Sequence, residues 1–323
     1  MNPLDKQNPL HQKRVLVTGG TGSLAKALLS RAKREKWETE FIIFSRDETK
    51  QTILKEKYPE HQFVLGDVAR YLDLKRALRG VDTVLHFAAY KQIPSAQNNI
   101  SATIQTNILG SQNVVDAAID QGVNQVVASS TDKAMSPENF YGVSKKAMEY
   151  IFQDANKYNA TTFHLARYGN VLLSNMSVGI LWKAQAKRGE PITITDERMS
   201  RFFLSLDQAI DLILLALQKE PGIIVVPRAP SMMMIDLAKV IGGDLPVIVS
   251  GIRAGEKLAE GMISESESFY VEQDEEHFYI HPPTSDYRNS DAPFSYMSDN
   301  SIGFLSHQEI KNMIEETERL YGI

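Results

Sequence analysis

The sequence predicts an α/β protein in which a doubly wound parallel sheet is followed by a smaller C-terminal domain. Short runs of apolar and β-branched residues alternate with segments of helical spacing up to about residue 170. Each run is apolar on both faces, which is typical of strands that helices cover on both sides. Repeated units of this kind form a parallel sheet. After residue 170 the alternation becomes irregular, which indicates a second domain.

The individual elements follow from these runs. The strands are expected within residues 14–20, 40–46, 62–68, 82–89, 125–131 and 162–170. Helical spacing between them is clearest in residues 24–37 and 106–122. The parallel sheet should therefore have about six strands and end near Asn170. Further along, residues 206–220 have the pattern of a helix and 222–227 that of one more strand.

Composition and charge exclude several classes of function. The 323 residues are 43% hydrophobic, which is enough for a large core. The formal net charge of -5 leaves no basic excess, so we expect neither nucleic acid nor a membrane surface as a partner. The acidic stretch 264–276 is expected to be exposed. Because the chain has no cysteine, disulfides, thiolate nucleophiles and cysteine-bound metals are excluded.

Apolar runs and histidine spacing in the sequence predict where the protein is located and whether it binds a metal. Residues 1–13 lack the apolar run of a signal peptide, and no segment approaches the roughly 20 apolar residues that span a bilayer. We therefore expect a cytoplasmic protein. No HExxH motif is present, and His277 and His281 form the only close histidine pair. Surface or core roles explain that pair, so no metal site is predicted.

A glycine-rich turn connects the first expected strand to the first helix. Gly19, Gly22 and Ala25 allow a tight turn and let the backbone approach a pyrophosphate at the helix N-terminus. This context predicts a Rossmann-type dinucleotide site rather than a merely structural turn. The expected contacts here are Gly19, Thr21, Gly22, Ser23 and Leu24. We assign residues 1–170, rejoined by about 202–228, to the cofactor domain, and 171–201 and 229–323 to a substrate-binding domain.

The end of the second strand decides between the two nicotinamide cofactors. An acidic residue there suits the 2′-hydroxyl of NAD, whereas Arg suits the 2′-phosphate of NADP. Ser45 and Arg46 come first, and Lys50 follows one helical turn later. We therefore expect NADP(H). Asp47 follows Arg46 and leaves NAD as an alternative, and the charges of Arg46, Asp47 and Lys50 could also belong to an ordinary helix start.

Two further strand ends supply candidate cofactor contacts. Asp67 and Val68 follow the third strand, where the adenine would lie. Ala88 and Ala89 follow the fourth strand, and their small side chains suit the approach of a pyrophosphate. Each of these residues could equally serve packing.

The chemistry is expected after the fifth strand. Tyr141 and Lys145 are spaced i,i+4, which places both on one face of a helix. An ammonium beside a phenol lowers the phenol pKa, so Tyr141 could take a proton from an alcohol as hydride leaves. Ser129, Ser130 and Thr131 end the preceding strand, and this context makes the Y-x-x-x-K pair significant.

These motifs resemble the extended short-chain dehydrogenase/reductase family over nearly the whole chain. Residues 130–146 resemble the nucleotide-sugar 4,6-dehydratases, with Lys133 where a Glu is common. The narrower resemblance is to the inverting UDP-N-acetylglucosamine 4,6-dehydratases of bacterial pseudaminic acid biosynthesis, a surface-sugar pathway. It is carried by AAYKQIP, TNILGSQNV, RYGNV, TITDERMSRFF and GIRAGEKLAE. Tyr141 favours this inverting group, because retaining relatives usually carry Met there.

The resemblance implies a redox-neutral reaction with tightly bound, recycled NADP(H). Tyr141 would deprotonate the 4-hydroxyl, and a neutral Lys133 would remove H5. A protonated Asp132 would donate a proton to the departing 6-hydroxyl. The implied catalytic set is Thr131, Asp132, Lys133, Tyr141 and Lys145. Because adjacent side chains on a strand point to opposite faces, the backbone must bend at Asp132 and Lys133.

The resemblance also assigns a UDP-sugar as substrate and, by analogy, a homo-oligomer. The implied substrate-binding residues are Lys91, which also contacts the cofactor, Asn170, Arg201, Arg253 and Glu256. Arg201 and Arg253 are suited to a diphosphate, although either could be an ordinary surface arginine.

One loop departs from the pattern of these relatives. Leu172 and Leu173 are bulky, Asn175 replaces an Arg, and Met176 replaces a Gly, which removes backbone freedom. These changes bear on which sugar the protein binds more than on its fold. A retaining dehydratase or a 4-epimerase on another UDP-sugar, and a catalytically silent NADP-binding sensor or scaffold, remain alternatives.

Overall fold

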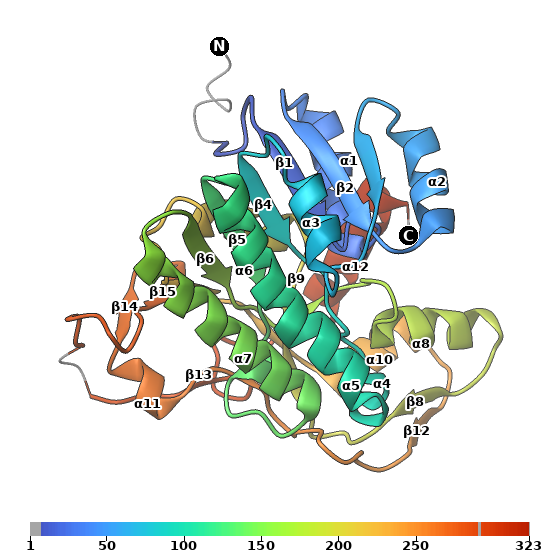
Figure 1. The fold of residues 1–323 in the computed structure, drawn as a ribbon. Helices are drawn as coiled ribbons and strands as arrows, with labels where there is room; N and C mark the ends of the chain where they lie inside the picture. The colour runs from blue at the N-terminus through green and yellow to red at the C-terminus, as the bar shows by residue number, and fades with distance from the viewer. Residues whose placement is uncertain (1–7, 290–291, 323) are drawn as a thin grey trace.

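The computed structural model describes residues 8–289 and 292–322, and its centre is a nine-stranded sheet (Figure 1). The prediction about a signal peptide concerns a stretch whose residues 1–7 lie outside this range. Seven neighbouring strands of the sheet are parallel. In their order across the sheet they are β3 (Gln62–Leu65), β2 (Glu40–Ser45), β1 (Arg14–Thr18), β4 (Thr83–His86), β5 (Gln125–Ser129), β6 (Thr162–Ala166) and β10 (Ile224–Pro227).

Two antiparallel strands extend the sheet beyond β10. They are β15 (His277–Ile280) and β14 (Val271–Gln273). The six parallel strands expected up to residue 170 are confirmed, and so is the further strand expected at 222–227, since β10 joins the sheet in parallel beside β6. The acidic stretch 264–276 is largely exposed, as expected, although Ser268 and Val271 are buried, and it contains α11 (Glu265–Ser268) and β14.

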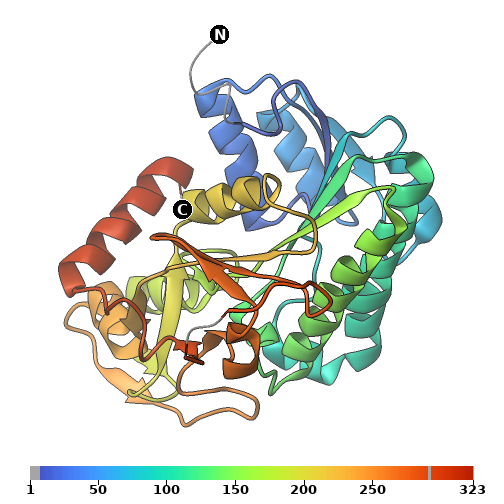
Figure 2. The same ribbon diagram turned by 90° about the vertical axis from the view of Figure 1, so that its left-hand side faces the viewer.

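Helices cover both faces of the sheet. In Figure 1, α3, α6 and α7 lie in front of it, and Figure 2 shows α1 together with α9 on the opposite face. The helices of this region are α1 (Ser23–Glu35), α2 (Glu48–Lys57), α3 (Tyr71–Ala77), α4 (Ile93–Asn98), α5 (Ile100–Thr103), the π-helical η1 (Ile104–Leu109), α6 (Gly110–Gln121), η2 (Asp132–Ala134), α7 (Phe140–Ala155), η3 (Asn156–Tyr158) and α9 (Leu206–Ala216).

The smaller C-terminal region has its own core. Its buried residues include Trp182, Ile192 and Leu237, which form a cluster separate from the core around the sheet. The elements of this region are β7 (Asn170–Val171), α8 (Val178–Lys187), β8 (Ile192–Ile194), β9 (Ser200–Leu204), β11 (Ser231–Met233), α10 (Met234–Gly242), β12 (Val247–Val249), β13 (Gly261–Ile263), α11, β16 (Tyr296–Met297) and α12 (His307–Tyr321). As the expected domain division has it, α9 and β10 return to the larger core, but the larger core also takes in residues of the expected substrate-binding domain, such as Met262, Phe278 and Tyr296. The division into two domains stays a prediction.

Within residues 8–289 and 292–322, no helix combines the length and apolar character needed to cross a bilayer. The same part of the chain contains no group of three or more His, Asp or Glu side chains arranged to hold a metal ion.

Candidate active site

One cavity of about 920 Å³ opens beyond the carboxyl ends of β1, β4 and β5 and brings the predicted site residues together. Its volume is within the range of about 300–1,000 Å³ typical of small-molecule sites. Every predicted site residue except Asp132 lines it. They are Gly19, Thr21, Gly22, Ser23, Leu24, Ser45, Arg46, Lys50, Asp67, Val68, Ala88, Ala89, Lys91, Thr131, Lys133, Tyr141, Lys145, Asn170, Arg201, Arg253 and Glu256.

The glycine turn between β1 and α1 has the geometry of a pyrophosphate cradle. Gly19 has φ +64°, and a Cβ there would lie 2.8 Å from the Ala88 backbone nitrogen, so only glycine fits. Thr18 Oγ1 accepts hydrogen bonds from the backbone N–H groups of Phe87 and Ala88, both at 3.2 Å, and so ties the end of β1 to the end of β4. These residues fit a dinucleotide at the N-terminus of α1.

The end of β2 presents two cations to the same cavity. Arg46 lies 3.6 Å from Asp67, and Lys50 lies 2.6 Å from Asp47. Asp47 is also the N-cap of α2, where its carboxylate accepts the Lys50 backbone N–H at 2.9 Å. The carboxylate of Asp47 is therefore already hydrogen-bonded within the protein. Exposed ion pairs such as Arg46–Asp67 and Lys50–Asp47 contribute little to stability, so both cations remain able to bind a phosphate.

The chain bends after β5, as the sequence predicts. Residues Asp132–Ala134 form the 3₁₀ turn η2, with Thr131 as its N-cap. Lys133 consequently lines the cavity, whereas Asp132 is fully buried behind it. Lys133 Nζ lies 3.0 Å from Asp132 Oδ1 and 3.3 Å from Glu260 Oε1.

The charge state of Lys133 differs from the expectation of a neutral amine. Burial alone would lower the pKa of Lys133, but the carboxylates of Asp132 and Glu260 outweigh burial and the repulsion from Arg201, and they raise this pKa above its ordinary value. The raised pKa therefore favours the ammonium form of Lys133. The expectation failed because it left out the attraction of the Asp132 carboxylate and did not recognise Glu260, far away in sequence, as a second neighbour.

Tyr141 and Lys145 lie on the first turns of α7, which Asn139 caps by accepting the Gly142 N–H at 2.9 Å. Burial raises the pKa of Tyr141 to about 12, although the Lys133 ammonium and a hydrogen bond with Thr131 act in the opposite direction. The expectation of a lowered tyrosine pKa is thus wrong, because burial outweighs the neighbouring cation. Burial also lowers the pKa of Lys145 to about 8, with Glu149 partly offsetting this effect.

The predicted substrate residues form the other wall of the cavity. Arg201 is nearly buried, and its guanidinium donates to the backbone carbonyls of Ser200, Lys257 and Leu258 at 2.6–3.0 Å. It therefore holds the loop that carries Arg253 in place. Arg253 itself is largely exposed and lies 3.6 Å from Glu256, so its guanidinium is accessible to a ligand.

The 172–176 loop is strained at two positions. Leu173 and Met176 have φ values of +53° and +60°, a region that side chains other than glycine rarely adopt. Leu173 is buried, whereas Met176 is 73% exposed and lines the cavity. Gln92 Nε2 donates to the Met176 carbonyl oxygen at 3.3 Å across the cavity mouth. Leu173 and Met176 thus adopt a backbone conformation that favours glycine, which costs about 1–3 kcal/mol of stability per residue.

Two functional candidates were missed by sequence reasoning. Glu260 lines the cavity and contacts Lys133. Tyr168 also lines it, and burial raises its pKa. Glu260 is the last residue of the GIRAGEKLAE motif, and Tyr168 lies in RYGNV. Glu260 and Tyr168 therefore lie within recognised motifs, but the spacing of residues in those motifs did not indicate which side chains they contact.

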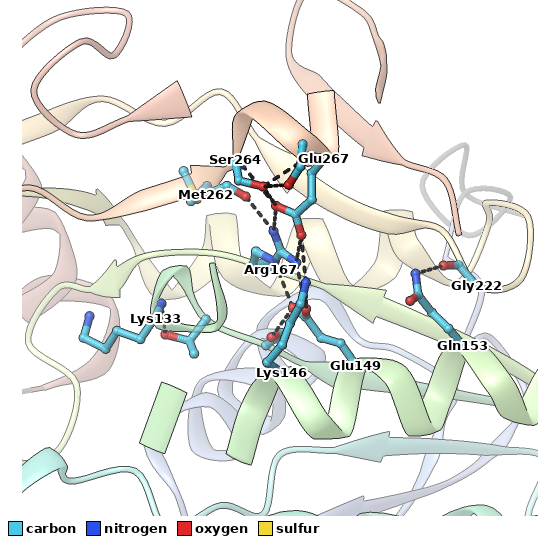
Figure 3. A network of polar contacts seen from close by, with 12 residues as sticks. Lys133, Lys146, Glu149, Gln153, Arg167, Gly222, Met262, Ser264 and Glu267 are labelled. Atoms are coloured by element: carbon cyan, nitrogen blue, oxygen red, sulfur yellow. Dashed lines mark hydrogen bonds and ion pairs between the residues drawn. The ribbon is translucent and has the colours of Figure 1, made fainter. Parts of the chain in front are cut away.

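A buried charge network supports the helix that carries Tyr141. Figure 3 shows Arg167 between Glu149 of α7 and Glu267 of α11. Its guanidinium makes two hydrogen bonds to Glu149, at 2.7 and 2.8 Å, and two to Glu267, at 2.9 and 3.0 Å. Lys146 adds a bond of 2.8 Å to Glu267, and Ser130 donates to Glu149 at 2.6 Å. The network joins α7, the end of β5 and the C-terminal region.

The fold and the site together define an extended short-chain dehydrogenase/reductase. The chain belongs to the polysaccharide biosynthesis protein family, whose model matches residues 15–282. A Campylobacter jejuni protein named UDP-N-acetylglucosamine 4,6-dehydratase (inverting) is 37% identical, covering 95% of this chain and 99% of the relative. A Rickettsia bellii protein named UDP-glucose 4-epimerase is 39% identical, covering 79% of both. The crystal structure of Pen from Bacillus thuringiensis is 32% identical, with a TM-score of 0.87, over 95% of this chain and 99% of that one.

Proposed function

We propose that the protein is an inverting UDP-N-acetylglucosamine 4,6-dehydratase that keeps and recycles NADP(H). The observation that carries the proposal is that Lys133 and Tyr141 line the same cavity as the glycine turn at Gly19. An oxidation site alone needs only the tyrosine and the cofactor. A second ionisable group at the same cavity allows a proton to be removed from a neighbouring carbon.

The cofactor end of the cavity supports a nicotinamide dinucleotide. Gly19 and Gly22 leave space for a pyrophosphate, and Arg46 and Lys50 offer positive charge to a 2′-phosphate. When bound, NADP supplies the oxidant for C4 and later returns the hydride to C6. The cofactor is therefore unchanged after each turnover.

Tyr141 is proposed to take the proton of the 4-hydroxyl. Its pKa of about 12 in the ligand-free protein means that it begins as a phenol, so a cation must favour the phenolate during the reaction. Lys133 already acts in that direction, and the positive charge of a bound nicotinamide adds to it. Lys145 is held at the end of β5 and is proposed to fix the geometry of this site.

Lys133 is proposed to remove H5 once C4 is a ketone. A carbonyl at C4 acidifies the hydrogen on C5, and loss of the 6-hydroxyl follows across the C5–C6 bond. Because Lys133 starts as an ammonium, it must first give up a proton. Asp132 and Glu260 are the carboxyl groups that contact it and can exchange protons with it.

The sugar nucleotide is proposed to lie along Lys91, Asn170, Arg253 and Glu256. Burial lowers the pKa of Lys91, which lies on the cavity wall between the two ends of the site. The exposed guanidinium of Arg253 suits a diphosphate. The net charge of -5 makes such a local cation necessary for an anionic substrate.

The test is incubation of the purified protein with UDP-N-acetylglucosamine, followed by mass spectrometry. A dehydratase forms a product lighter by one water without added oxidant. A protein that retains bound cofactor but never converts any UDP-sugar would be the sensor or scaffold of the alternative reading.

A second candidate is 4-epimerisation of a UDP-sugar, which the likeness to the Rickettsia bellii protein favours. An epimerase product has the mass of its substrate, so the same spectrum separates the two reactions. Epimerisation at C4 requires no base for H5, so Lys133 would have no catalytic role in that reaction. Retention at C5 is the remaining alternative and is separated by the configuration of the product.

A further inference from the structure

We propose that His86 is a positioning residue of the cofactor site. As a neutral ring that carries its hydrogen on Nε2, it holds the segment 87–91 against the glycine turn and links this segment to the helix of Tyr141. The inference rests on the cofactor site of the proposed function but not on the proposed reaction. It assigns a role to a buried histidine that does not itself line the cavity.

His86 lies at the end of β4 between two hydroxyl groups. Its Nδ1 is 2.8 Å from Thr18 Oγ1, and its Nε2 is 3.2 Å from Ser111 Oγ. All three side chains are at most 1% exposed, and the imidazole stacks on Phe152 with the two rings inclined by 15°. Each ring nitrogen of His86 therefore finds its hydrogen-bond partner within the protein.

The two hydroxyl groups require the same tautomer of His86. Thr18 Oγ1 already accepts two backbone N–H groups of the segment 87–91, so its own proton is left to donate to Nδ1. Ser111 Oγ donates its proton to the Asn107 carbonyl oxygen at 2.7 Å, so it accepts from Nε2. Nδ1 is therefore the acceptor of the ring, and Nε2 carries the hydrogen.

The same contacts keep the ring neutral. A second hydrogen on Nδ1 would point at Thr18 Oγ1, which would then face three donors, and the threonine proton would have no acceptor. Burial and the ammonium of Lys145 act in the same direction and lower the pKa of His86 to about 3. At neutral pH His86 is thus a fixed hydrogen-bonding group rather than a proton carrier.

The first anchor of the segment 87–91 lies beside the glycine turn. Thr18 Oγ1 accepts the first two N–H groups of the segment, both at 3.2 Å. The backbone of Ala88 approaches Gly19 so closely that a Cβ on the glycine would lie 2.8 Å from the Ala88 nitrogen. Because the Thr18 proton is directed at His86, the lone pairs of this oxygen stay on the two N–H groups. The backbone is thereby held where a dinucleotide is proposed to bind.

The second anchor is Asn107 in the π-helical η1, at the far end of the chain of hydrogen bonds from His86. Its side chain accepts the Tyr90 N–H at 2.7 Å and donates to the Tyr90 carbonyl oxygen at 3.1 Å. It also donates to Ser144 Oγ at 2.9 Å, and Ser144 donates to the Tyr141 carbonyl oxygen at 2.7 Å. One buried network therefore joins the cofactor end of the cavity to the helix of Tyr141.

The test compares His86→Leu, which removes both ring nitrogens, with His86→Asn, whose amide oxygen can replace Nδ1 as the acceptor. The probes are NADPH and NADH, each titrated into the apoprotein, so the result depends neither on cofactor preference nor on turnover. We expect His86→Leu to weaken the binding of both at least about tenfold, because the Thr18 hydroxyl loses its acceptor. His86→Asn should stay within about threefold of the unsubstituted protein.

His164→Leu is the matched control. His164 is also a buried histidine on a strand of the same sheet, β6, but it lies away from the cavity. Its removal should leave the affinity for both cofactors within about twofold. An equal loss in His164→Leu and His86→Leu would show that general destabilisation is the cause, and unchanged affinities in His86→Leu would refute the positioning role.

A second measurement does not depend on the folding of His86→Leu. In protein with isotope-labelled histidine, a proton–nitrogen NMR spectrum at neutral pH identifies which ring nitrogen carries hydrogen, and His86→Asn assigns the signal. We expect His86 to carry hydrogen on Nε2 alone. A ring with hydrogen on Nδ1, or on both nitrogens, would overturn the proposal, because the Thr18 proton would then have no acceptor.

Thr18→Val tests whether the two side chains act as one unit. This substitution removes the other partner of the same hydrogen bond, so its loss of affinity should not add to that of His86→Leu in the double variant. Additive losses would contradict the proposed link. If the unsubstituted protein binds neither NADPH nor NADH, the proposed cofactor site fails and this inference falls with it. A protein that binds cofactor but converts no UDP-sugar refutes the proposed reaction and leaves the role of His86 intact.

Discussion

Lys145 Nζ donates a hydrogen bond to the Ser129 carbonyl oxygen at 2.6 Å, which anchors the first turns of α7 to the end of β5. The side chain is 3% exposed, and Met148 Sδ is its other close polar neighbour at 3.0 Å. A buried ammonium with so few partners is costly, which explains why its pKa falls to about 8.

This buried lysine predicts a pH-dependent stability. The pKa is about 8 in the folded protein and near 10.5 when unfolded, so the unfolded chain binds more protons between these values. The free energy of unfolding should therefore rise with pH across this window, by about 3 kcal/mol from this group. Lys145→Met should remove that rise, as measured by urea unfolding at pH 7.5 to 10.5. Identical slopes for both proteins would mean that Lys145 is not buried as an ammonium.

The two proton-transfer roles predict different failures. Tyr141→Phe removes the group that takes the 4-hydroxyl proton, so single-turnover formation of NADPH should fall by at least about 100-fold. Lys133→Met should still form NADPH slowly but stall before water leaves, because H5 has no base. Absorbance of NADPH and mass spectrometry of the quenched mixture distinguish these cases. Water loss at the unsubstituted rate in Lys133→Met would refute the role of this lysine.

Cofactor preference depends on the exposed cations after β2. Arg46→Ala should weaken NADP binding at least about tenfold while changing NAD binding little, because only NADP has the 2′-phosphate. Titration of the apoprotein with each cofactor measures both affinities. Arg188→Ala is a matched control, since Arg188 is an exposed arginine paired with Glu190 away from the cavity. Equal losses for NAD and NADP in Arg46→Ala would remove the argument for NADP.

The buried network at Arg167 is expected to hold the protein together. Arg167→Met leaves the carboxylates of Glu149 and Glu267 with Lys146 as their remaining cation, and should reduce the free energy of unfolding by about 3–5 kcal/mol. The surface control Arg188→Met should change it by less than about 1 kcal/mol. Chemical denaturation of both variants measures the difference. A small effect at Arg167 would show that the network is dispensable for stability.

The sequence predicted those features whose cause is local. Gly19 is required by a tight turn between neighbouring elements, and Tyr141 and Lys145 meet because four residues separate them on one helix. Their positions on the cavity follow from strand order, which βαβ repetition largely determines. The cofactor end of the site was therefore accessible to sequence reasoning.

Other features depend on contacts between distant segments. Glu260 reaches Lys133 only because β13 packs beside η2, and its carboxylate adds to that of Asp132 in raising the pKa of Lys133. Arg201 was expected to face a diphosphate, but its hydrogen bonds go to carbonyls of the 257–258 segment. The strands β14 and β15 were missed because they have only three and four residues, and because β14 stands within acidic, polar sequence.

The loop at Leu173 and Met176 carries backbone strain at the cavity. Met176 lines the cavity and has a φ of +60°. Met176→Gly should relieve the positive φ and raise the free energy of unfolding by about 1 kcal/mol. Thermal unfolding measures the change, and a loss of stability would show that the methionine side chain contributes more than the strain costs.

The proposed reaction removes water from UDP-N-acetylglucosamine and inverts C5. Both parts are tested by one reaction in heavy water, followed by mass spectrometry and proton NMR of the product at early times. Removal of H5 and its replacement from solvent predict a product that has lost one water, carries deuterium at C5 and shows the couplings of the L-arabino configuration. A product of D-xylo configuration at the earliest times, or a UDP-sugar of unchanged mass, would contradict the account.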